Sequence, residues 1–368
     1  MTHCSHKYRA YPTTEQEELL AKTFGCSRFV WNQILDWRSQ EYSQNGTKTN
    51  YSKSSAKLTN LKKDPEFNWL SEVSSVALQQ SLRNQDAAFR NFFEKRGKYP
   101  TFKSKHGHQS IRLVSTGFRI KDGQLFIAKS NTPLRITLSR PLPDQVKSIT
   151  ISRDAAGRYY VAFQGEKETK LLSPSDKSIG IDLGLISFIT TSDGEKVEPL
   201  QIYRKHEIRL ARYQRMIARR QKGSNNRKVA RHKVGRIHVK IANIRNDFLH
   251  KLSTRIIREN QTVAVEDLNI AGMQQNRHLA KSIADAGWGE FVRQLQYKAE
   301  WYGRTFVKVN RWYPSSQICS NCGHRDGKKT LGVRAWICSE CGTVHDRDIN
   351  AAININTAGL AEINGCQI

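Results

Sequence analysis

The sequence predicts a multidomain α/β protein, in which a helical segment is inserted into an N-terminal β domain and a second α/β domain follows. Three observations predict this class. At 368 residues the chain is long enough for two or three domains, because single domains commonly run to about 150 residues. One strand pattern precedes a long helical stretch, and several follow it. A further set of buried strand patterns begins after a polar linker.

The N-terminal domain is expected to begin with a strand, because residues His6 to Tyr11 alternate polar and aromatic side chains. A capping box formed by Thr14 and Glu17 then opens a pattern with apolar side chains at helical spacing. Helical spacing recurs until the segment Gly97 to Pro100. We therefore predict that residues 13–101 form a helical insertion.

Period-two patterns replace the helical ones from about Phe102 onward. The segments Asp122-Gly123 and Asp154-Ala-Ala-Gly157 are typical of hairpin turns between such strands. One strand before the helices and several after them predict that residues 1–12 and 102–170 together build a small β-barrel or sheet.

The C-terminal domain is expected at residues 171–368, after a polar linker that contains proline. The run from Ser178 to Thr191 predicts a buried strand, a turn and a second strand, and Thr262 to Glu266 predicts another buried strand. A long amphipathic helix is expected from Ile283 to Tyr302.

The charge balance points to nucleic acid as a partner. Lys and Arg number 60 against 33 Asp and Glu, which gives a formal net charge of +27. Such an excess repels itself unless a polyanion neutralises it, and an anionic membrane surface is the alternative partner. The membrane is disfavoured, because the sequence has no run of about 18 apolar residues and no apolar signal segment at its N-terminus. We expect a cytosolic protein.

The segment from Tyr203 to Asn260 combines a helical pattern with nearly unopposed positive charge. Phosphate contacts from such a segment supply affinity without sequence information, whereas the alternative is a solvated basic face. The candidate nucleic-acid-binding residues are Arg212, Arg215, Arg219, Arg220, Arg227, Lys228 and Arg231.

Three carboxylates stand out by their position. Asp182 follows Ile-Gly-Ile in a hydrophobic strand, where an isolated charge is costly, and Glu266 ends a similar strand. Asp348 opens a helical segment rich in small residues. Carboxylates that meet bind hard divalent cations such as Mg²⁺, which position a phosphodiester and activate water. A strand Asp, a later strand-end Glu and an Asp at a helix start are, in this order, the layout of RNase H-like folds.

Each acid alone has a simpler explanation. A strand-end Asp or Glu is often solvated or bonded to a loop amide, and Asp348 could be a helix N-cap. Asp267 and Asp346 are near competitors for the same site. Period-two alternation puts Asp267 on the face opposite Glu266, so only one of them can join Asp182, and we favour Glu266.

Four of the seven cysteines form two pairs, Cys319-Ser-Asn-Cys322 and Cys338-Ser-Glu-Cys341. This spacing is typical of tetrahedral Zn²⁺ coordination, and four thiolates leave no open position for water, so we expect a structural zinc. A redox disulfide relay is the alternative. Trp336 is expected to pack against this ribbon. No special role is expected for Cys4, Cys26 and Cys366.

In these motifs the chain resembles the TnpB family, transposon-encoded RNA-guided DNA endonucleases that are similar to an ancestor of type V CRISPR effectors. The resemblance covers nearly the whole length. Its carriers are Gly180-Ile-Asp182-Leu-Gly184, Val265-Glu266-Asp-Leu268, Ser282-Ile-Ala-Asp-Ala-Gly-Trp288, Trp312-Tyr-Pro-Ser-Ser316 and His345-Asp-Arg-Asp348-Ile-Asn-Ala-Ala352.

The resemblance implies that Asp182, Glu266 and Asp348 are a RuvC-like catalytic triad that works with two Mg²⁺ ions. The implied partners are a guide RNA from the transposon end and target double-stranded DNA, both strands of which are cut in turn at the single RuvC site. The implied location is the cytosol of a bacterium or archaeon, where the protein acts on the nucleoid.

The resemblance also assigns the domains. It implies a wedge β-barrel at residues 1–12 and 102–170, interrupted by a recognition domain at residues 13–101. In the family these domains read a short motif beside the target. It further implies a RuvC-like nuclease domain at residues 171–368, with a zinc ribbon inserted at residues 315–345.

One departure from the family is visible, because Gln317 stands where its members usually place Lys after Pro-Ser-Ser, and any phosphate contact there loses its charge. Two other functions are alternatives. An RNA-guided repressor that binds DNA without cutting normally lacks a triad acid, and all three are present here. A transposase with a covalent tyrosine or a DDE-type site is the third reading, but no histidine pair with a nearby tyrosine stands out.

Overall fold

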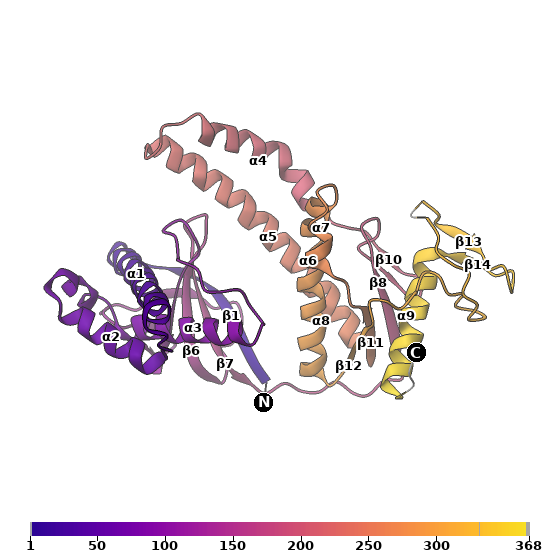
Figure 1. Cartoon of the computed structure of the whole chain (residues 1–368), viewed down its shortest axis with the longest axis horizontal. Coiled ribbons are helices and arrows are strands. Elements are labelled where there is room, and N and C mark those ends of the chain that lie inside the picture. The colour runs from indigo at the N-terminus through magenta and orange to yellow at the C-terminus, as the bar shows by residue number, and fades with distance from the viewer. Residues whose placement is uncertain (1, 331, 366–368) are drawn as a thin grey trace. The chain divides into compact units, whose positions relative to one another are not determined.

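The computed structural model describes residues 2–330 and 332–365, so Cys366 lies outside the described residues. The chain divides between Glu168 and Thr169 into two compact units (Figure 1). The predicted multidomain α/β class is confirmed, because both units combine a β-sheet with helices. Within the described part, no helix has the length and apolar content needed to cross a membrane.

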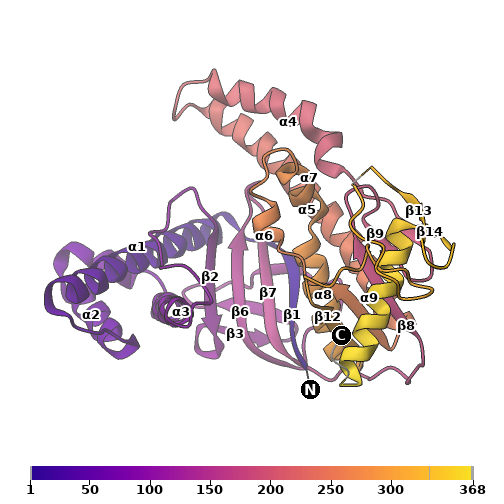
Figure 2. The ribbon, with the colours of Figure 1, turned by 45° about the vertical axis from the view of Figure 1, so that its right-hand side comes forward.

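The first unit is built on a five-stranded sheet. Its strands are β1 (Thr2–Tyr11), β2 (Gln109–Val114), β5 (Arg135–Thr137), β6 (Gln145–Arg153) and β7 (Tyr159–Lys167). The order is β2-β6-β7-β1-β5, and Figure 2 shows β2, β6, β7 and β1 side by side. All pairings are antiparallel, and β1 pairs with β7 from Thr2 opposite Lys167 to Ala10 opposite Tyr159. The first strand therefore belongs to the same sheet as strands more than a hundred residues later.

Helices fill the segment between β1 and β2. They are α1 (Thr14–Asn45), α2 (Tyr51–Lys63), α3 (Ser75–Phe93) and the 3₁₀ turn η1 (Pro65–Ser71), while a second 3₁₀ turn, η2 (Ser115–Gly117), follows β2. The capping box of α1 is formed by Thr13 and Gln16 rather than by the predicted Thr14 and Glu17. Gln16 completes the capping box because its Oε1 accepts a hydrogen bond from the Thr13 amide. Its Nε2 donates to the Thr132 carbonyl at 3.0 Å.

Both predicted hairpins are present. Asp122 and Gly123 join β3 (Phe118–Lys121) to β4 (Gln124–Ile127), and both have a positive φ, as a tight two-residue turn requires. The segment from Asp154 to Gly157 joins β6 to β7, where the Asp154 carboxylate accepts from two backbone amides. A bridge between Leu125 and Leu134 connects the β3–β4 hairpin to the end of the sheet that carries β5.

The second unit contains a mixed five-stranded sheet. Its strands are β8 (Ser178–Leu183), β9 (Ile189–Thr191), β10 (Lys196–Val197), β11 (Thr262–Glu266) and β12 (Thr305–Val309). The order is β10-β9-β8-β11-β12, and β8, β11 and β12 run parallel. The two-stranded sheet of β13 (Ala335–Ile337) and β14 (Val344–Asp346) lies apart from it in the cysteine-rich segment.

Helices cover both faces of this sheet. The helices of this unit are α4 (Ile202–Ala218), α5 (Asn225–Glu259), α6 (Ile270–Met273), α7 (Ala280–Ala286), α8 (Trp288–Tyr302) and α9 (Arg347–Ile363), and α4 packs on α5 rather than on the sheet. One face packs on α5 and α8 through a core that includes Ile181, Val265, Leu249 and Phe291. The other face packs on α9 through Ala264 and Ile355, and Figure 1 shows these helices on opposite sides of the strands.

The single helix predicted from Ile283 to Tyr302 is wrong, because Gly287 separates α7 from α8. Gly287 has φ +74, a left-handed conformation that ends α7 and redirects the chain. The break brings the Asp285 carboxylate to the start of α4, where it accepts from the Tyr203 amide at 3.0 Å.

Candidate functional site

The parallel pairing of β8 and β11 places Asp182 beside Glu266. Val265 lies opposite Ile181 in the register, so the next residues on each strand are Glu266 and Asp182. Ile181 and Val265 point into the core under α5 and α8. Because side chains alternate along a strand, Asp182 and Glu266 point together to the other face, which α9 covers.

Helix α9 lies very close to this face because small residues stand on both sides. A Cβ on Gly180 would lie 2.1 Å from the Ala352 carbonyl oxygen, and one on Gly359 would lie 2.5 Å from the Ala264 Cβ. Asp346 caps the helix by accepting from the amides of residues 348 and 349, so Asp348 stands in the first turn. The close approach therefore carries Asp348 to the same end of the sheet as the two strand acids.

Asp182, Glu266 and Asp348 line one cleft of about 590 Å³, so the structure brings the three predicted acids together. The same cleft is lined by Arg311, Trp312, Gln317, Arg334 and Arg347. Arg334 lies 3.4 Å from the Asp348 carboxylate. Among the described residues, the acids do not form a group whose oxygens all lie within 4.8 Å, a spacing that only the four cysteines meet.

The electrostatics of the cleft favour a cation. Burial, with the nearby charges of Glu266 and Asp348, raises the pKa of Asp182 to about 7. Burial, followed by repulsion from Asp267, also raises the pKa of Glu266. A carboxylate whose charged form is disfavoured in this way is stabilised by a positive ion beside it. The donor set is oxygen only, which suits a hard divalent cation.

The two competing acids are held by other partners. Asp267 forms ion pairs with Arg311 and with Lys308, the latter at 3.9 Å. Asp346 is the N-cap of α9 and pairs with Lys196 at 2.7 Å. Their charges are thus balanced within the protein.

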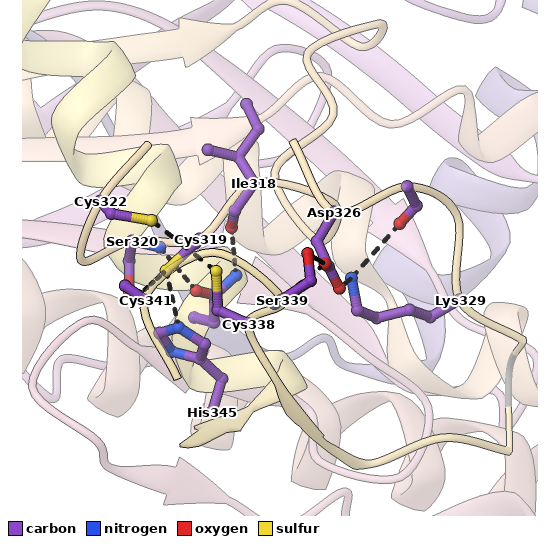
Figure 3. Close-up of polar contacts among 12 residues, drawn as sticks. Ile318, Cys319, Ser320, Cys322, Asp326, Lys329, Cys338, Ser339, Cys341 and His345 are labelled. Atoms are coloured by element: carbon purple, nitrogen blue, oxygen red, sulfur yellow. Dashed lines mark hydrogen bonds and ion pairs between the residues drawn. The ribbon is translucent and has the colours of Figure 1, made fainter. Parts of the chain in front are cut away.

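The four paired cysteines form a second candidate site, a metal centre (Figure 3). Their Sγ atoms all lie within 4.8 Å of one another, and Figure 3 shows the sulfurs turned toward a common point. The Sγ atoms of Cys319 and Cys341 are 3.6 Å apart, which is well beyond the S–S bond length of about 2.05 Å in a disulfide. This geometry suits a bound metal ion better than the redox relay. The remaining described cysteines, Cys4 and Cys26, lie in the first unit.

Two knuckles shape this centre. Gly323 and Gly342 have φ +77 and +68, and their amides donate to the carbonyls of Cys319 and Cys338 at 2.9 and 3.0 Å. The contact with Thr343 lowers the pKa of Cys341, whereas contacts with the other three sulfurs help to raise that of Cys322. A metal ion among the four sulfurs would favour the thiolate form of each.

Aromatic packing supports the centre from one side. As predicted, Trp336 packs against the ribbon, and its ring lies 4.6 Å from that of His345. The Nε2 atom of His345 lies 3.0 Å from the Cys319 sulfur. No role at the metal centre was predicted for His345, because it stands outside the cysteine pairs and appears only as the first residue of the motif that contains Asp348.

Two buried asparagines connect the metal centre to α9, and the sequence did not predict them. Asn350 accepts from the Ser320 amide at 2.9 Å and donates to the Ile318 carbonyl at 2.8 Å. Asn354 donates to the carbonyls of Ser315 and Ile318 at 2.8 and 2.7 Å. The first knuckle is thus bonded to the helix that carries Asp348. Two asparagines four residues apart among small residues were the available signal.

The predicted basic residues lie on α4, on α5 and in the turn between them. Arg212, Arg215, Arg219, Lys228 and Arg231 are exposed. Arg227 is partly buried, and it donates to the carbonyls of Ile217 and Arg220 at 2.9 and 2.6 Å. Arg220 donates to the Asn226 carbonyl at 2.5 Å. Arg220 and Arg227 therefore hold the turn together, while the other five leave their charges in solvent.

Comparison with known proteins gives three family matches. A model described as "Helix-turn-helix domain" matches residues 1–47, one described as "Probable transposase" matches residues 162–277, and one described as "Cas12f1-like, TNB domain" matches residues 288–355.

Full-length relatives are also found. A Streptomyces pristinaespiralis protein is 48% identical over 96% of this chain and 89% of its own, and the Escherichia coli K12 protein InsQ is 33% identical over 96% and 92%. Both carry the name "Putative RNA-guided DNA endonuclease". The solved structure of a Cas12f1-sgRNA-target DNA complex covers 94% of this chain and 83% of its own with a TM-score of 0.58; at 16% identity it shows a shared fold.

Proposed function

Since this chain belongs to the TnpB family, we propose that it is a transposon-encoded, RNA-guided endonuclease that cleaves double-stranded target DNA. The observation that carries the proposal is the 48% identity, over 96% of this chain, to a relative named for this activity. A guide RNA supplies sequence recognition by base pairing, and basic protein surfaces hold the phosphate backbones. Cleavage takes place next to a short motif on the target duplex.

We propose that the cleft of Asp182, Glu266 and Asp348 is the single nuclease site, of the RuvC type. The three carboxylates would hold two Mg²⁺ ions, which supply Lewis acidity and activate water for attack on the phosphate. Carboxylate oxygens from three segments that line one cleft are the ligands that such hard cations prefer. The strands and α9 fix the acids, and Arg334 and Arg347 draw the phosphate backbone into the cleft.

We further propose that the four cysteines bind Zn²⁺ and that residues 315–345 are a ribbon with a structural role. Four thiolates complete a tetrahedral shell and leave no position for substrate. For the first unit we propose a wedge barrel at residues 1–12 and 102–170, with a recognition insertion at 13–101. The Leu125–Leu134 bridge supports a partly closed barrel.

An RNA-guided repressor that binds DNA without cutting it is the alternative, and the presence of all three acids in one cleft favours the nuclease. The test uses purified protein with the RNA that copurifies with it. Sequencing that RNA gives the guide, and a DNA duplex complementary to it is then incubated with the complex and Mg²⁺. We expect cut DNA. DNA that is bound but left intact would support the repressor instead.

The contact at Gly180 gives a prediction about catalysis. A Cβ there would lie 2.1 Å from the Ala352 carbonyl and 2.5 Å from the Asn356 amide nitrogen, so Gly180→Ala must move α9. Because Asp348 moves with α9, we expect cleavage to fall by about 10- to 100-fold, as for misplacements near 1 Å. Single-turnover cleavage with saturating complex measures the effect.

Gly289→Ala is the matched control, because a Cβ on this exposed residue would meet only the Ile270 side chain at 3.7 Å. We expect its cleavage rate to equal that of the wild type. An unchanged rate in Gly180→Ala would show that Asp348 does not need its present position.

The exposed charges of the α4–α5 hairpin give a second prediction. Replacing Arg212, Arg215, Lys228 and Arg231 by glutamine should weaken RNA binding and reduce the salt dependence of the affinity. Each lost phosphate contact lowers the slope of log K against log salt by about 0.7 to 0.9. Filter binding of the guide RNA at several salt concentrations measures this.

The control exchanges Arg212, Arg215 and Arg231 for lysine, which keeps the charge, and it should retain the wild-type slope. An equal slope in the glutamine variant would mean that these side chains form a solvated face. Arg227 is left unchanged in both variants because it holds the turn.

A further inference from the structure

Trp312 is the most solvent-exposed tryptophan of the described chain. Its relative exposure is 84%, whereas Trp288, Trp31 and Trp336 are at most 7% exposed and Trp69 is 38% exposed. Burying an indole is favourable, so a large aromatic ring left in water at a functional cleft indicates a surface that a ligand covers.

The backbone around Trp312 is well ordered by local bonds. The Trp312 amide donates to the Asn310 side chain and the Tyr313 amide to the Asn310 carbonyl, both at 2.9 Å. Pro314 follows, and its carbonyl accepts from the Gln317 amide at 2.8 Å. The turn starts directly after Val309, which lies opposite Glu266 in the sheet. The backbone that carries the ring is therefore held next to the strand that pairs with β11.

The surroundings of Trp312 define the chemistry of its ligand. Trp312 lines the same cleft as Asp182, Glu266 and Asp348, together with Arg334 and Arg347. A flat aromatic ring with cationic side chains nearby is the usual platform for single-stranded nucleic acid, because every base has a face that can stack. The cations held by the acids would contact a phosphate, and the indole ring would contact a base of the same strand.

We propose that the Trp312 indole stacks on an unpaired nucleobase of the DNA strand being cut, next to the scissile phosphate. This inference rests on the proposed nuclease function and adds a subsite to it. A base inside a duplex is already stacked on both sides, so the platform accepts a strand only after the guide RNA has opened the duplex. Stacking sets the register of the backbone and brings one phosphate to the three acids.

The test uses the whole complex of protein, guide RNA and target DNA under single-turnover conditions. Trp312→Ala is expected to slow cleavage by about 5- to 100-fold, as for other base-stacking aromatics, and Trp312→Phe to retain most of the rate. Leu171→Ala, at a 65% exposed apolar side chain of the linker, is the control and should cleave normally. Binding of the guide RNA should be unchanged in all three variants.

Substrates with one abasic nucleotide at successive positions around the cut separate stacking from a structural role. At one abasic position, the cleavage rate of the wild type should fall by the same factor that Trp312→Ala causes on the intact substrate. The rate of Trp312→Ala should not fall further at that position, because the stacking contact is already absent. The inference would be overturned if Trp312→Ala cut the intact substrate at the wild-type rate. It would also be overturned if the abasic substrates slowed the wild type and Trp312→Ala by the same factor at every position. Failure of the wild type to cut any substrate would overturn the proposed function itself.

Discussion

Asp182→Asn is expected to abolish DNA cleavage while the complex still binds its target. Asparagine keeps the size of the side chain but removes the charge that would hold a divalent cation beside Glu266 and Asp348. Losing several kcal/mol of metal stabilisation in the transition state corresponds to a rate loss of more than about a thousandfold. Cleavage in Mg²⁺ and target binding by gel shift, measured on the same preparation, give both halves of the result.

Folding should survive this change. The Asp182 carboxylate is disfavoured by burial and by two neighbouring acids, so a neutral amide should not lower the melting temperature of the metal-free protein. Asp176→Asn, at an exposed position of the linker, is the control and should cleave normally. If Asp182→Asn cut DNA at the wild-type rate, the catalytic site would have to lie elsewhere.

The strand acids were predictable because the two signals that locate them are local. Asp182 and Glu266 each end or interrupt an apolar run, and such runs predict buried parallel strands. The choice of Glu266 over Asp267 followed from alternation alone, and Asp267 is indeed paired with Lys308 and Arg311. The position of Asp348 depends on the packing of α9 against Gly180, and a local sequence pattern does not predict such a long-range contact.

Three other features of the structure could not be predicted from the local sequence. A glycine inside a helical pattern is usually tolerated, so nothing local indicated that Gly287 would take a positive φ and split the helix. The number of positive charges does not distinguish Arg220 and Arg227 from their neighbours, although their guanidinium groups donate hydrogen bonds to backbone carbonyls. The hydrogen bonds of Asn350 and Asn354 join segments some 30 residues apart, and they depend on how the knuckle folds.

Cys338→Ser is expected to lose the bound zinc and to impair both folding of the ribbon and DNA cleavage. Cys338 is buried, and its sulfur lies 3.7 Å from that of Cys322, so a hydroxyl there removes one of four ligands. Folding of a small metal site depends on the binding free energy of its metal. Metal analysis of the purified variant should show depletion. The control is Cys4→Ser, on a strand of the first unit, which should keep its zinc.

The loss should reach the nuclease site through the asparagines, because the knuckle that zinc holds is bonded to α9 at Asn350 and Asn354. Asn354→Ala separates the two effects. It leaves every cysteine in place, so zinc should stay bound, yet it removes the shorter hydrogen bond to the Ser315 carbonyl and one of the two to the Ile318 carbonyl. We expect this variant to bind zinc and to cleave more slowly than the wild type. Stoichiometric zinc in Cys338→Ser would refute the metal assignment, whereas normal cleavage by Asn354→Ala would limit the role of zinc to the ribbon itself.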